Sequence, residues 1–294
     1  MGFGGTSPCA QKKGDVIFIE EHPEELLVSG RFTPKPVVFG TNKHEGSFVL
    51  GGMYVHILFF EKLFHYCDSI RLLLFFSKSF YHFLVMYNRY IEPRGLVHNS
   101  SFLQHEFLPT MLDALGLHDS SGVIYEVIEH DYFNISDLGD WDKMMPGMIN
   151  IVGTFFIKAA TYEFMKYNTI HGGQSHFYSL EYEGENSIWN LLFMTEKPPL
   201  PHGVTHADDL IYVFSTGLFE RTGHDLEISQ DISSLWTNFA SSGKFITKGG
   251  MEIPNWTEQS PRYLKIDVED EVHTDFIYTW NNPDRLDNCG IGRH

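Results

Sequence analysis

Short apolar runs alternate with longer helical patterns along most of the chain. Residues 35–42 form a β-branched run that ends in Gly-Thr-Asn, which is typical of a buried strand that leads into a loop. Residues 174–182 alternate polar and apolar positions, as a strand does, and residues 262–268 form a last predicted strand. Because these strands alternate with helical segments, the pattern predicts an α/β architecture.

The helical segments have recognisable ends. The patterns predict helices over residues 102–117, 121–132, 148–167 and 231–242. The third helix is expected to stop at Asn168 and the Gly172–Gly173 pair, and the fourth to begin at Asp231 and end before Gly243, because Asp is favoured at helix starts and Gly just beyond helix ends.

One stretch breaks this pattern. Residues 55–85 hold seven of the 25 phenylalanines and six leucines, yet five charged residues interrupt the stretch, so no uninterrupted membrane span is present. The apolar positions show neither a helical nor a strand period, although a buried helix stays open. We interpret residues 52–85 as an intron-derived insert, because the codons of Gly52 and Val85 can be written as splice sites whose separation is divisible by three.

Composition narrows the function classes. The 294 residues are 43% hydrophobic and 20% charged, which indicates a globular protein, and the formal net charge of −17 argues against a nucleic-acid partner. Cys9, Cys67 and Cys289 are too few for a disulfide framework, and their spacing does not suit zinc.

Two loops carry candidate chemistry. The loop at residues 40–47, GTNKHEGS, places Glu45 just beyond a predicted strand, where α/β folds put their sites. The loop at residues 203–214, GVTHADDLIYVF, places His206 ahead of a predicted helix. Each residue alone is more often structural. In the order acid then base, however, they match the second half of the nucleophile, acid and base order of α/β-hydrolases.

These loops resemble the acid and histidine motifs of the type-B carboxylesterase/cholinesterase family, especially its insect esterases. HPEELLVSGRFTPKPVVFGTN, SLWTNFASSGKF and IPNWTEQSPRYLKI are similar to further segments of that family. The likeness covers about residues 14–52 and 86–283 of a single partial domain, residues 1–294. It implies an incomplete α/β-hydrolase fold, the C-terminal half of the mostly parallel sheet with flanking helices. It also implies Glu45 and His206 as catalytic acid and base in hydrolysis of carboxylic esters.

The chain departs from the family in one respect. It contains no G-x-S-x-G nucleophile motif, and no oxyanion glycine run precedes Glu45. Both are expected upstream of Met1, as is any signal peptide, so we predict that this chain alone is inactive and poorly stable. The alternative is a non-catalytic adhesion or binding protein, like the neuroligin-like and glutactin-like relatives that lose triad members. A splice isoform acting as a decoy is a third interpretation.

The remaining candidates are minor. His202, His206, Asp208 and Asp209 could be read as a metal site, but the Pro-rich lead-in argues against the helix that i, i+4 zinc ligands use. We therefore expect no metal and no organic cofactor. Asn99, Asn134 and Asn255 begin N-x-S/T sequons, which fits a secreted, glycosylated parent. The ester substrate and the oligomeric state do not follow from the sequence.

Overall fold

The computed structural model describes residues 17, 19–48, 50, 92–114, 122–193, 202–214 and 220–274. Cys9, Cys67, Cys289 and the proposed insert at residues 52–85 lie outside this part of the chain. Within it, no helix has both the length and the apolar character needed to cross a bilayer.

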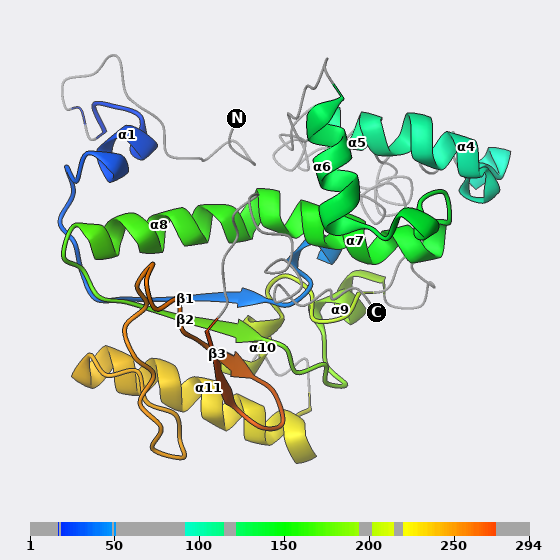
Figure 1. The fold of residues 1–294 in the computed structure, drawn as a ribbon. Coiled ribbons are helices and arrows are strands. Elements are labelled where there is room, and N and C mark those ends of the chain that lie inside the picture. The colour runs from blue at the N-terminus through cyan, green and yellow to red at the C-terminus, as the bar shows by residue number, and fades with distance from the viewer. Residues whose placement is uncertain are drawn as a thin grey trace, which may run out of the picture.

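A mixed four-stranded sheet lies at the centre of the described fold (Figure 1). Its strands are β1 (Val37–Asn42), β2 (Ser175–Leu180), β3 (Tyr263–Ile266) and β4 (Glu271–His273), in that spatial order. The first three are parallel, and β4 is antiparallel to β3. The sequence predicted the first three strands, whereas the short β4 was missed.

One face of the sheet is covered by a long helical segment. It consists of α7 (Trp141–Gly153), a π-helical turn η7 (Thr154–Lys158) and α8 (Ala159–Ile170). The prediction of a helix over residues 148–167 was right in type but too short. Asp140 caps the N-terminus of α7 by accepting a hydrogen bond from the N–H of Lys143 at 3.3 Å. The chain turns back after α8 at Gly172, with φ +91°.

The other face carries α10 (Asp208–Val213) and α11 (Gly223–Ser242) (Figure 1). The predicted start of α11 at Asp231 was wrong, because the helix begins eight residues earlier. Ile228, Ile232 and Leu235 are buried at helical spacing and hold both halves of α11 against the sheet. The predicted end was right, since Gly243 caps the helix with φ +70°.

The remaining helices lie around these layers. They are α1 (Pro23–Val28), η3 (Glu92–Arg94), η4 (Leu96–His98), α4 (Ser100–Phe102), the π-helical turn η5 (Leu103–Phe107), α5 (Leu108–Ala114), α6 (Val123–Tyr132), η6 (Ile135–Asp137) and α9 (Ile188–Phe193). The predicted helices over residues 102–117 and 121–132 correspond to the α4–α5 segment and to α6, although residues 115–121 lie outside the description.

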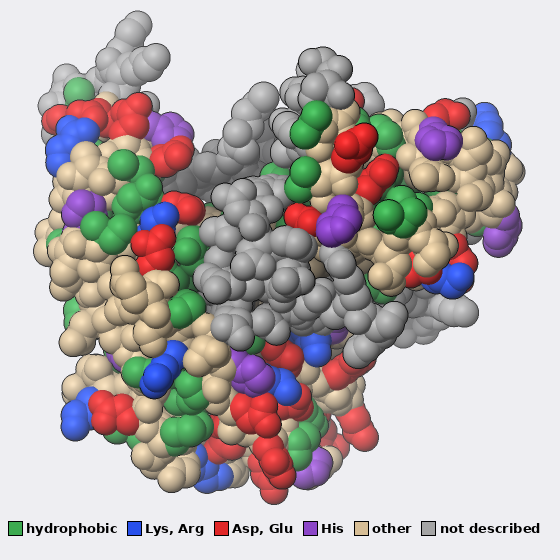
Figure 2. Space-filling model, viewed as in Figure 1, with side chains coloured by type: hydrophobic (Ala, Val, Ile, Leu, Met, Phe, Trp, Pro, Cys, Tyr) green, Lys and Arg blue, Asp and Glu red, His purple; other side chains and the backbone are tan. Residues whose placement is uncertain are grey.

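The sheet separates two hydrophobic cores. Phe177 of β2 and Tyr263 of β3 belong to the core beneath α7 and α8, whereas Tyr178, Leu180 and Leu264 belong to the core on the α11 side. All six residues of β2 are buried, as expected for a strand covered on both faces. On the face shown in Figure 2, acidic side chains are spread over the surface and basic ones are scattered among them, in keeping with the negative net charge.

Candidate functional site

Glu45 lies immediately beyond the C-terminal end of β1, at the start of a short helical turn. Its Oε1 accepts a hydrogen bond from the backbone N–H of Asn42 at 2.7 Å, and the residue is 2% exposed. A buried carboxylate needs such partners, because removal from water is otherwise costly. The hydrogen bond from Asn42 therefore holds Oε1 of Glu45 in place and leaves the second oxygen, Oε2, available to another group.

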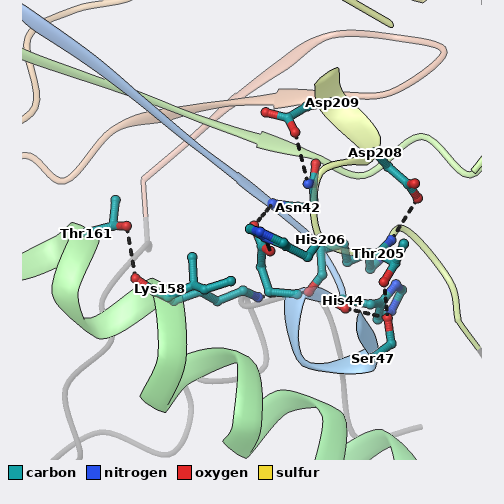
Figure 3. A network of polar contacts seen from close by, with 12 residues as sticks. Asn42, His44, Ser47, Lys158, Thr161, Thr205, His206, Asp208 and Asp209 are labelled. Carbon is teal, nitrogen blue, oxygen red and sulfur yellow. Dashed lines mark hydrogen bonds and ion pairs between the residues drawn. The ribbon is translucent and has the colours of Figure 1, made fainter. Parts of the chain in front are cut away.

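His206 supplies that group. Its Nδ1 lies 2.6 Å from Glu45 Oε2, although 161 residues separate the two in sequence. The His206 side chain is 43% exposed and that of Glu45 is 3% exposed, so the carboxylate is hidden while the imidazole reaches the surface. Since the carboxylate accepts at Nδ1, the imidazole proton sits there and the other ring nitrogen, Nε2, is the basic one. Figure 3 shows His206 beside Asn42, the last residue of β1.

The surroundings favour the cationic form of His206. Partial burial alone would lower the pKa of its imidazole, but the hydrogen bond and charge of Glu45 outweigh this effect, with help from Asp209 and Asp208. The pKa of His206 therefore lies above its usual value of 6.5. A base that gains a proton more readily, and then stabilises it beside a carboxylate, is suited to general acid–base chemistry.

The sequence interpretation considered Asp209 only as part of a metal site and missed its hydrogen bonds beside Glu45 and His206. Its Oδ1 accepts a hydrogen bond from the Asn42 side chain at 3.2 Å, and its Oδ2 accepts one from the hydroxyl of Tyr178 at 2.8 Å. Burial, reinforced by the charge of Asp209, holds the pKa of Tyr178 well above its usual range, so this phenol remains a donor. Asp209 thus links the start of α10 to the end of β1 and to the middle of β2.

Asp208 joins the loop that carries His206 to the start of α9. It is 3% exposed and accepts hydrogen bonds from Ser187 Oγ and from the backbone N–H groups of Ile188 and Thr205. Burial raises the pKa of Asp208 to about 6, although the backbone donors oppose this shift. The described residues hold no group of three or more side chains arranged to bind a metal ion.

Ser47 is close to Glu45 but is not oriented as a nucleophile. Its hydroxyl donates to the carbonyl of His44 at 2.7 Å and forms a second hydrogen bond with the hydroxyl of Thr205, with 2.8 Å between the two oxygens. Ser47 and Thr205 are both fully buried. The hydroxyl therefore fastens the acid-bearing loop to the histidine-bearing loop (Figure 3).

The acid loop, residues 40–47, also packs closely against η7 and the end of α7. A Cβ built on Gly46 would lie 1.9 Å from the carbonyl oxygen of Ile149 and 2.5 Å from the backbone nitrogen of Gly153. On the same side, the buried Lys158 donates from Nζ to the carbonyl of Lys43 at 2.8 Å. π-helical turns are frequent at functional sites, and here one supports the loop that carries Glu45.

The three sequon asparagines differ in their surroundings. Asn99 is exposed and its side chain accepts a hydrogen bond from the N–H of Phe102 at 3.1 Å. The half-buried Asn134 donates to Asp137 at 2.9 Å. Asn255 is also half-buried, and its side-chain oxygen accepts from the N–H of Ser175 at 2.6 Å. Asn255 therefore supports the start of β2.

Comparison with known proteins identifies the family. The model of the carboxylesterase family matches residues 6–280. Over 145 residues, 48% of this chain and 24% of the relative, the chain is 21% identical to acetylcholinesterase-1 of Trittame loki. Over 106 residues, 34% of this chain and 18% of the relative, it is 32% identical to the juvenile hormone esterase of Tribolium castaneum.

The match to these relatives spans about a quarter of their length or less. This is consistent with the observed architecture, a mixed four-stranded sheet with helices on both faces that forms part of an α/β-hydrolase fold. Because the family model covers most of the sequence, the chain belongs to the carboxylesterase family.

Proposed function

We propose that this chain supplies the acid and the base of a serine carboxylesterase, with Glu45 as the acid and His206 as the base. The observation that carries the proposal is the 2.6 Å contact between Glu45 Oε2 and His206 Nδ1. The carboxylate is buried and held by the Asn42 N–H, while the side chain of His206 is 43% exposed. Membership of the carboxylesterase family supports a carboxylic ester as the substrate class.

The contact between the two side chains supports a role for each of them. In ester hydrolysis by a serine enzyme, Nε2 of the histidine takes the hydroxyl proton as serine attacks the carbonyl, then gives it to the departing alcohol. Water repeats the sequence on the acyl-enzyme and releases the acid. Glu45 orients the imidazole of His206 and stabilises the imidazolium, in accord with the raised pKa of His206. The reaction needs no metal or organic cofactor.

The nucleophile is the missing part of this set. The sequence has no G-x-S-x-G motif, and the hydroxyl of Ser47 is already engaged within the loops. Without a serine nucleophile and oxyanion donors, the chain loses covalent catalysis and about 3–4 kcal/mol of transition-state stabilisation per missing donor. We therefore expect the chain alone to be inactive toward esters.

The test begins with the transcript upstream of the Met1 codon. If it encodes a G-x-S-x-G motif, the extended protein is expressed and assayed for hydrolysis of p-nitrophenyl esters, beside this chain alone. Glu45→Gln and His206→Asn should each lower kcat/KM, by up to about four orders of magnitude for loss of a triad charge. Glu227→Gln and His224→Asn are matched controls, because His224 Nδ1 contacts Glu227 Oε2 at 2.9 Å on the exposed surface.

Two outcomes would contradict this function. Hydrolysis by this chain alone that survives both site substitutions would show that the acid–base pair is not the origin of activity. An upstream motif with another residue in place of serine would instead favour a non-catalytic binding protein. Control variants should retain full activity, since their pair lies on the exposed surface of α11.

We further propose that the parent protein is secreted and glycosylated at Asn99. Of the three sequon asparagines, Asn99 is exposed, whereas Asn134 and Asn255 are half-buried. Expression in insect cells, followed by mass spectrometry before and after enzymatic glycan removal, should show a glycan that Asn99→Gln abolishes. An unchanged mass in the wild-type protein would contradict the proposal.

A further inference from the structure

The loops that carry Glu45 and His206 are joined by two hydrogen bonds between His44 and Val204. The backbone N–H of His44 donates to the carbonyl of Val204 at 2.8 Å. In return, the backbone N–H of Val204 donates to Nδ1 of the His44 ring at 2.9 Å. We call this contact the His44–Val204 clasp. The clasp brings His44, the residue before Glu45, into direct contact with Val204, which lies two residues before His206.

The clasp fixes the protonation state of His44. A backbone N–H can only donate, so Nδ1 of His44 must accept and cannot carry a proton. The ring in the clasp is therefore neutral, with its proton on Nε2. Protonation would place an N–H on both ring nitrogens and oppose the Val204 donor.

The fit around the ring leaves little room for another arrangement. A Cβ built on Gly203, whose φ is +53°, would lie 2.1 Å from His44 Nδ1, so the ring rests directly against this glycine. The carbonyl of His44 is held by both the N–H and the hydroxyl of Ser47, at 2.9 and 2.7 Å. Val204 is 1% exposed, so its N–H has no easy replacement partner in water.

We propose that His44 is a positioning residue, whose neutral ring holds the histidine loop in register with the acid loop and whose protonation separates Glu45 from His206. The functional part of this proposal rests on the assignment of Glu45 and His206 as acid and base. The consequence is a loss of catalytic geometry on the acid side of the pH profile, caused by a residue that does not touch the reacting atoms.

Several charged or titratable groups lie around the clasp. The acid loop contributes Lys43 and Glu45, and η7 contributes Lys158. The histidine loop contributes His202, His206 and Asp208. Lys43 pairs with Glu181 at 3.3 Å, which partly neutralises its charge. The carboxylates favour protonation of His44, and the cations oppose it.

The experiment uses the full chain labelled with ¹⁵N. At pH 8, the nitrogen spectrum of His44 should show an unprotonated Nδ1 and a protonated Nε2. As the pH falls and His44 gains its second proton, hydrogen exchange of the Val204 amide, corrected for its intrinsic pH dependence, should accelerate about tenfold, the effect of losing one hydrogen bond of typical strength. The Lys43 amide is an internal control, because it donates to the Leu180 carbonyl, which does not titrate.

Two variants separate the acceptor from the charge. In His44→Asn, the amide oxygen can take the place of Nδ1 and cannot be protonated in this range, so Val204 should stay protected at low pH. In His44→Leu the acceptor is removed, so Val204 should exchange faster at every pH. The His206 Nδ1 proton bound to Glu45 should follow Val204 in all three proteins.

The results distinguish this proposal from the proposed function. A protonated Nδ1 on His44 at pH 8, or equal acid sensitivity of Val204 in wild type and His44→Asn, would overturn the positioning role. If the clasp behaves as expected but the His206 proton shows no bond to Glu45 at any pH, the acid–base assignment fails instead. If His44→Leu does not fold, the comparison of wild type with His44→Asn still decides.

Discussion

Replacing Gly46 by alanine tests how tightly the acid loop is held against α7. The new Cβ would lie 1.9 Å from the Ile149 carbonyl oxygen and 2.5 Å from the Gly153 nitrogen, both backbone atoms. Ordinary contacts begin at 3.4 Å, so the loop and helix must separate by roughly 1.5 Å. The hydrogen bonds of α7 hold its backbone in place, so the loop must move.

The magnitude follows from this displacement. Overpacking a well-packed core costs about 1–3 kcal/mol. Both atoms that the new Cβ would meet are backbone atoms of α7, which cannot rotate away, so the cost belongs at the upper end of that range. We expect Gly46→Ala to lower the free energy of unfolding by about 3 kcal/mol, which is about a hundredfold in the folding equilibrium. Because Glu45 is the neighbouring residue, the same shift should lengthen its contact with His206.

Urea denaturation followed by circular dichroism measures the effect. Gly249→Ala is the matched control, because the nearest atom to its new Cβ is Thr247 Oγ1 at 3.8 Å, an ordinary contact. That variant should change stability by no more than about 0.5 kcal/mol. If Gly46→Ala is as stable as Gly249→Ala, the acid loop is not packed against α7 as the structure describes, and the reasoning is refuted.

Three further predictions concern the histidine side of the site. Asp209→Asn should lower the pKa of His206 in an NMR titration, because one of the charges that favours the imidazolium is removed. Ala207→Gly should raise the free energy of unfolding by about 0.5–1 kcal/mol in urea, because Ala207 has φ +69° and relief of that strain exceeds the entropy cost of glycine. The pKa of His206 in the folded state lies above its usual value of 6.5. Protonation of His206 therefore stabilises the fold, and this contribution is complete below pH 6.5. It is lost as the pH rises through the folded-state pKa. The stability difference between wild type and His206→Gln, measured from pH 5 to pH 9, should narrow over that range, and a constant difference would count against the prediction.

The sequence predicts the elements that carry the site better than the contacts within it. The predicted strand at residues 35–42 corresponds to β1 (Val37–Asn42). Glu45 lies beyond the C-terminal end of this strand, as expected. The start of α11 was misplaced because Asp231 is a favoured N-cap type, whereas buried Ile228 continues the apolar stripe further upstream. Asn168 was expected to end a helix, but it lies inside α8, where its side chain donates to the Lys35 carbonyl and to Ser175 Oγ. That long-range role has no local signal.

The pairing of Glu45 with His206 came from family resemblance rather than from spacing. A separation of 161 residues gives no geometric information without a fold. The hydrogen bond between Asp209 and Tyr178 was missed for the same reason, because it joins two elements that are distant in sequence. The neutral His44 was not visible either, since only the direction of the Val204 N–H reveals which ring nitrogen accepts.

The central claim is that Glu45 and His206 form an acid–base pair, and an NMR titration of His206 tests it most directly. The pKa of His206 should lie above 6.5 in the wild-type chain and fall in Glu45→Gln, because the hydrogen bond and charge of the carboxylate outweigh the effect of burial. Glu227→Gln should leave it unchanged. A His206 pKa that is the same in wild type and Glu45→Gln would contradict the account.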